Sequence, residues 1–135
     1  MKQSAFQFTT PRLTSIIYKE NSSIKLEHEK KFDCQSSISV KKRTQIATVE
    51  LTMIIGEKDK TPFFICGQIE ADFKWDDSFS DDMIDKMLKN NAASLLLSYL
   101  RPIIANITNY SRFHTINIPF MDFRESIDVS NNSDS

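Results

Sequence analysis

The sequence predicts an α+β domain, in which a four-stranded antiparallel sheet comes first and a long apolar helix follows. Apolar and polar residues alternate through much of the first 75 residues, whereas helix-spaced apolar residues dominate from 83 to 108. Strands followed by helices are the element order of an α+β fold. The chain has 135 residues, so we expect one domain over residues 1–125 and a disordered polar tail over 126–135.

Residues 5–19 predict a bent strand at the edge of the sheet. Apolar residues alternate with polar ones on both sides of Pro11, but in opposite phases: Phe6 and Phe8 before it, and Leu13, Ser15 and Ile17 after it. A phase change of one residue indicates a bulge. A proline cannot donate to a sheet ladder, which favours the edge position.

Three further strands are expected in the order of a meander. The second covers residues 27–41, with Phe32, Cys34, Ile38 and Val40 on one face, and ends in a turn at residues 41–43. The third alternates cleanly over residues 47–55, which is typical of a central strand with one wet face. Residues 56–60 form a hairpin loop, and the fourth strand then directs a last apolar set to the core: Phe63, Ile65, Ile69, Ala71 and Phe73.

Ser80 predicts the start of the helical half, because Asp81 and Asp82 follow it where the helix dipole favours negative charge. A short helix over residues 83–88, a break at Asn90 and Asn91, and a long helix to residue 108 are expected. Pro102 should kink the long helix near residue 98, where a backbone hydrogen bond is lost.

The long helix is too apolar for a single core. On a helical wheel its large apolar side chains sweep about 200°, twice the arc that one sheet covers: Leu95, Leu96, Leu97, Tyr99, Leu100, Ile103, Ile104 and Ile107. A partner subunit or a hydrophobic ligand must therefore cover the rest.

Composition excludes several classes of function. The net charge of −1 gives no general attraction to nucleic acid, and the basic run 41–43 lacks interleaved aromatics. The N-terminus has no apolar signal-peptide core, and no apolar run reaches the ~18 residues of a membrane span. We therefore expect a cytoplasmic protein without membrane insertion, in which Cys34 and Cys66 are reduced, buried small hydrophobes.

No constellation for catalysis is visible. His28 and His114 are isolated, and neither Gly56 nor Gly67 lies in a phosphate-binding loop. The acidic cluster over residues 76–82 is interpreted as solvated capping. The sequence thus predicts a non-enzyme with no cofactor and no metal.

Aromatic residues concentrate in the two connectors around the long helix. They either close over the core as lids or line an apolar groove that binds a polypeptide: Phe73, Trp75 and Phe79 before the helix, and Tyr110, Phe113, Phe120 and Phe123 after it.

Three segments, in this order and spacing, resemble the SecB-like chaperones: residues 62–73 (PFFICGQIEADF), 95–104 (LLLSYLRPII) and 113–120 (FHTINIPF). The resemblance implies the predicted sheet with a long kinked helix and a short second helix on one face. It also implies a homotetramer, built as a dimer of dimers with the long helices between the sheets. An interface of that kind would use Leu96, Tyr99, Leu100, Ile103 and Ile107.

The implied function is an ATP-independent holdase, which binds unfolded polypeptides or preproteins and in protein export passes them to the SecA motor. Clients would bind at Phe73, Trp75, Phe79, Phe113 and Phe120. The family's acidic motor-docking position corresponds to Cys66 here, so docking falls to Glu70 or Asp72. The alternatives are a carrier of small hydrophobic ligands, an oligomeric scaffold, and a chaperone dedicated to one partner such as an antitoxin-like protein.

Overall fold

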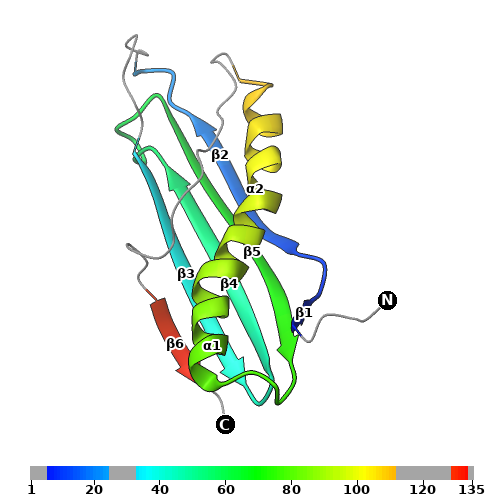
Figure 1. Ribbon diagram of the computed structural model, residues 1–135. Helices are drawn as coiled ribbons and strands as arrows, with labels where there is room; N and C mark the ends of the chain where they lie inside the picture. Colours follow the sequence, from blue (N-terminus) through cyan, green and yellow to red (C-terminus); the bar gives the residue numbers. More distant parts are fainter. Residues whose placement is uncertain (1–5, 25–32, 112–128, 134–135) are drawn as a thin grey trace.

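A computed structural model describes residues 6–24, 33–111 and 129–133 of the chain. Within them a twisted sheet carries one long helical segment across one of its faces (Figure 1). The elements in chain order are β1 (Phe6–Phe8), β2 (Arg12–Glu20), β3 (Cys34–Arg43), β4 (Ile46–Ile55), β5 (Phe63–Trp75), α1 (Asp81–Lys86), the π-helical turn η1 (Met87–Asn91), α2 (Ala92–Thr108) and β6 (Val129–Ser133).

The sheet is antiparallel throughout except at β6. Its strand order is β1-β5-β4-β3-β6, and β2 also pairs with β5. The predicted α+β class with a long helix on one face is confirmed, and β3, β4 and β5 are neighbours in the order of the predicted meander. The first predicted strand departs from that order, since it pairs with β5, the last of the four predicted strands. Alternation in the sequence shows which face of a strand is buried, but it does not show which strand lies beside it.

The N-terminal edge is bent as predicted. β1 and β2 both pair with β5, Pro11 lies between them, and the register shifts between Leu13 and Ser15. After this bulge Ile16 and Tyr18 face the core, and Ile17 between them is exposed.

The basic run 41–43 was predicted to be a turn and is instead the end of β3. Arg43 pairs with Ile46, and the turn falls on residues 44–45, where Gln45 has φ 58°. The three basic residues continue the antiparallel pairing with β4. A two-residue loop is enough to close the hairpin, so the turn does not need them. The start of the predicted second strand, residues 27–32, lies outside the described residues.

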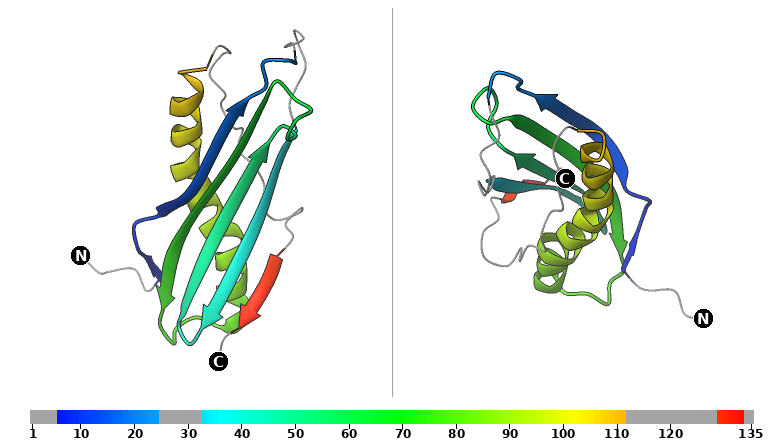
Figure 2. Two further views of the ribbon diagram at one scale, coloured as in Figure 1. Left: turned by 180° about the vertical axis from the view of Figure 1, so that it is seen from behind. Right: turned by 90° about the horizontal axis from the view of Figure 1, so that it is seen from above.

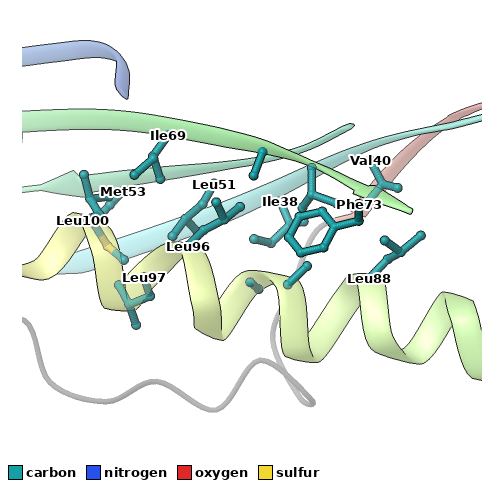
Figure 3. Packing of buried hydrophobic residues seen from close by; sticks show 14 of the residues in the cluster. Ile38, Val40, Leu51, Met53, Ile69, Phe73, Leu88, Leu96, Leu97 and Leu100 are labelled. Atoms are coloured by element: carbon teal, nitrogen blue, oxygen red, sulfur yellow. The ribbon is translucent and has the colours of Figure 1, made fainter. Parts of the chain in front are cut away.

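The core lies between the sheet and the helix. One side of β4 and β5 is buried along almost its whole length, as the alternation predicted, and β3 adds the buried Ile38 and Val40. Leu96 and Leu100 of α2 point toward Leu51 and Ile69 (Figure 3). The helix lies close to the sheet at Gly67, where a Cβ atom would lie 3.1 Å from Leu100 Cδ1 and 3.3 Å from Ile16 Cδ1. A glycine in β5 therefore lets α2 pack against the seam between β5 and β2.

The helical half starts at Ser80, as predicted, and its hydroxyl accepts a hydrogen bond from the Met83 amide at 3.2 Å. The expected break at Asn90 and Asn91 is wrong, because η1 joins α1 to α2 without interruption. Pro102 lies inside α2 as expected. No segment of the described helices is long and apolar enough to span a membrane.

β6 lies parallel to β3, with Val129 opposite Ile38 and Ser133 opposite Lys42. It occupies the edge of the sheet opposite to β1 and β2 (Figure 2). Five residues of the tail that the sequence predicts to be disordered thus form a strand, and not all strands lie in the first 75 residues as predicted. Side-chain alternation could not reveal this strand, because its residues are almost all polar.

Candidate functional site

An aromatic cluster forms where β1 meets the end of β5, and we name it by its five members, Phe6, Phe8, Phe73, Trp75 and Phe79. The ring of Phe6 lies at its centre, with centroid distances of 5.7 Å to Phe73, 6.4 Å to Trp75 and 6.2 Å to Phe79. Phe8 adds a contact of 6.1 Å to Phe73. These separations are typical of stabilising aromatic pairs.

The cluster grades from the core to solvent. Phe73 is fully buried, Phe6, Trp75 and Phe79 are half-buried, and Phe8 is 46% exposed. Of the residues predicted to bind clients, Phe73 is therefore part of the core that the other rings pack against, whereas Trp75 and Phe79 keep solvent-accessible surface. The predicted Phe113 and Phe120 lie outside the described residues.

Sequence reasoning missed Phe6 and Phe8 as members of this surface. They enter it through strand pairing, because Phe6 lies opposite Trp75 and Phe8 opposite Phe73. Their alternation was visible in the sequence, but the neighbour of this strand was not.

The residues predicted for the oligomer interface divide into two groups. Leu96 and Leu100 have no exposed surface, because they pack against the sheet of their own chain. Tyr99 is 41% exposed, and Ile103 and Ile107 are half-buried. The side chains still available to a partner form a stripe at every fourth residue: Leu95, Tyr99, Ile103 and Ile107.

The sheet face away from the helix is polar around the predicted docking residues. Arg12 Nη2 lies 3.1 Å from Glu70 Oε1, and Arg12 Nη1 lies 3.8 Å from Asp72 Oδ2. Thr48 donates a hydrogen bond of 2.6 Å to Asp72. Beside this group is a shallow, solvent-open cavity whose lining carries both signs of charge: Ser39, Lys41, Arg43, Thr48, Glu50 and Glu70. Glu70 and Asp72 are accessible, but Arg12 of the same chain already pairs with them.

Two further groups of titratable residues stand out among the described ones, the two cysteines and the acidic connector before α1. Both cysteines are free, and partial burial raises the pKa of the Cys34 and Cys66 thiols, which disfavours the reactive thiolate. They are half-buried rather than buried as predicted. In the described ranges no three His, Cys, Asp or Glu residues are placed to hold a metal ion. The Ser78 hydroxyl and amide donate to Asp76 and lower its pKa, so this acidic connector serves local capping.

These observations define the class of fold. The N-terminal strands β1 and β2 pair with β5, and a long apolar helix covers one face of the antiparallel sheet. This arrangement is the SecB-like fold that the sequence resembles.

A particular structure makes the likeness concrete. The Mycobacterium tuberculosis Rv1957 SecB-like chaperone, solved in complex with a ChAD peptide from the HigA1 antitoxin, is similar with a TM-score of 0.69, over 86% of this chain and 90% of that one. The two sequences are 11% identical, so the likeness is one of fold. A protein of unknown function from Streptococcus agalactiae is more distant, with a TM-score of 0.48 at 16% identity over 85% of this chain and 97% of that one. No family profile matches the sequence, and no curated protein matches it.

Proposed function

We propose that this protein is an ATP-independent chaperone that holds unfolded polypeptides. The observation that carries the proposal is the aromatic cluster, which presents half-buried and exposed rings at the open edge of a SecB-like sheet. Exposed apolar surface of this kind is typical of a site that binds another chain. The peptide bound to the similar M. tuberculosis protein supports a polypeptide as the ligand.

Binding at such a site needs no reaction. Phe8, Trp75 and Phe79 offer large rigid contacts to apolar side chains of any sequence, while Phe73 fixes the cluster to the core. An unfolded chain exposes such side chains and a folded protein buries them. The protein would therefore act by mass action, lowering the concentration of free unfolded chains and hence their aggregation.

We propose that the helix stripe of Leu95, Tyr99, Ile103 and Ile107 joins copies of this chain into a homo-oligomer. The apolar arc of α2 extends beyond the part that its own sheet covers. Exposing the uncovered apolar side chains to water is unfavourable, which favours their burial against a partner. A dimer of dimers would bury these stripes together and leave the aromatic clusters outside.

Two narrower roles follow from this proposal. In protein export, Glu70 and Asp72 would dock a basic surface of a motor such as SecA, which would have to compete with Arg12. The antitoxin peptide on the M. tuberculosis protein favours the other role, a chaperone dedicated to one partner. Both place the protein in the cytoplasm, where unfolded precursors and antitoxins are made.

The test is the aggregation of a chemically denatured substrate diluted into buffer without nucleotide, followed by light scattering. The protein should suppress scattering at about equimolar oligomer. Phe8→Ser should weaken suppression about fivefold, since one exposed aromatic contact contributes about 1 kcal/mol. Ile17→Ser is the matched control, because Ile17 is 50% exposed but lies opposite Cys66, far along β5 from the cluster. Unchanged scattering with the wild-type protein would refute the holdase function.

A further inference from the structure

The β3 edge of the sheet carries a strand that is poorly suited to stay there. β6 pairs with Ile38 to Lys42 of β3, but β3 itself is ten residues long. Four of the five β6 residues are Ser or Asn, and asparagine is depleted in strands. Its pairing is also parallel, which is slightly less stable per residue than antiparallel pairing.

β3 is, by contrast, a good acceptor for a strand. Its register against β4 is unbroken from Cys34 to Arg43, so its other edge presents a regular row of backbone groups. Ile38 and Val40 are buried at this edge, beside the core. An added strand with apolar residues at alternate positions could extend the core past them.

The opposite edge lacks these properties. Pro11 interrupts it, the bulge between Leu13 and Ser15 breaks its register, and β1 has only three residues. Bulges, prolines and short strands are the features that prevent an edge from pairing with another chain. An incoming strand is therefore directed to β3.

We propose that the β3 edge is a strand-addition site for an extended polypeptide segment with alternating apolar residues, and that β6 occupies this site until such a segment displaces it. The inference rests on the proposed function for the identity of the occupant, a client chain. Backbone pairing gives affinity for many sequences, and the alternating side chains select segments that would form strands. β6 covers the unpaired edge when no client is bound, which protects the protein from edge-to-edge aggregation.

A disulfide can lock β6 in place within the full-length chain. Ser39 and Ser130 are register partners, so we would introduce Ser39→Cys and Ser130→Cys together with Cys34→Ala and Cys66→Ala. The oxidised and reduced forms of this one protein are then matched. Circular dichroism of both forms reports whether the fold is kept.

The probe is a fluorescein-labelled peptide Lys-Thr-Val-Thr-Val-Thr-Val-Lys, and its control carries proline in place of the central valine. Anisotropy should show binding to the reduced form and at least about tenfold weaker binding to the oxidised form. Hydrogen exchange should show that the peptide slows the amides of β3 in the reduced form and that the control peptide does not. Equal affinity in the two forms, or no change in the β3 amides, would overturn the inference.

A second variant keeps the proposal testable if the disulfide does not form. Asn131→Val with Asn132→Thr raises the strand propensity of β6 and should weaken peptide binding, whereas unchanged binding counts against the site. The aggregation assay separates the two proposals. If the protein suppresses aggregation but binds the peptide equally well with and without the disulfide, it is a holdase without this site. If it neither suppresses aggregation nor binds the peptide, the proposed function itself is refuted.

Discussion

At the scale of single residues, Gly67 controls how the helix meets the sheet. Because Gly67 has no side chain, the side chains of Leu100 and Ile16 can approach its backbone. A Cβ atom at this position would lie 3.1 Å from Leu100 and 3.3 Å from Ile16. Alanine there would require both ends to move by a few tenths of an ångström, but a branched side chain cannot be accommodated this way. The contact thus depends on glycine for close approach and not for an unusual backbone angle.

Gly67→Val should destabilise the fold by about 1–3 kcal/mol through overpacking. Urea unfolding at one fixed protein concentration measures the loss. Combining it with Leu100→Ala should cost less than the sum of the two single changes, because the shortened side chain makes room. Additive losses would show that the two residues are not in contact. Cys66→Val, on the neighbouring outward-facing position of β5, is the control and should change stability little.

Sequence reasoning at this scale found types and faces but not neighbours. It assigned Ile65, Ile69 and Phe73 to the core correctly, since alternation reports the buried face directly. It predicted Leu96 and Leu100 for a subunit interface, and both pack inside their own chain. The wheel gave the width of the apolar arc but could not say which part of it the sheet would cover.

At the scale of elements, the helical segment wraps around the sheet with the help of η1. The buried residues form two groups, with Ile84 before this turn and Leu88 within it in the first, and Ala93, Leu97 and Ile104 after it in the second. On an ideal α-helix these two groups would differ by more than 100° in direction, and one extra residue in a π-turn corrects about 100°. The turn therefore keeps one face on the sheet over the whole segment, where the sequence had predicted a break.

Substitutions on the two sides of α2 should have opposite effects. Ile103→Asp should dissociate the proposed oligomer and leave the monomer folded, because a charge at a subunit interface costs several kcal/mol. Leu96→Asp should unfold the chain, since this side chain has no exposed surface in the monomer. Multi-angle light scattering gives the mass, and far-UV circular dichroism gives the fold. An unchanged mass for Ile103→Asp would remove the helix stripe from the interface.

The elements were predictable where a periodic pattern existed. β4, β5 and the start of α1 at Ser80 agree with the sequence, and the N-terminal edge strand was recognised by its phase change. The strand order and β6 were not predictable, because both depend on backbone pairing between segments far apart in the chain. The aromatic cluster was half found for the same reason.

At the scale of the whole molecule, the two faces of the sheet have different characters. The helix covers one face, and the other changes along the strands from the basic side chains Lys41, Arg43 and Lys74, past the acidic Glu70 and Asp72, to a row containing Ile17, Ile54 and Cys66. The aromatic cluster lies at one end of the covered face, beside β1. The proposed assembly, client binding and partner docking would thus use separate surfaces of a small domain.

The proposed function requires that the aromatic cluster recognises the unfolded state of other proteins. It is tested most directly by binding, without nucleotide, of a disulfide protein in two forms, native and permanently unfolded by reduction and carboxymethylation. Size-exclusion chromatography with light scattering should show a complex with the unfolded form and none with the native form, and Phe8→Ser should weaken that complex. Binding of neither form, or equal binding of both, would contradict the account.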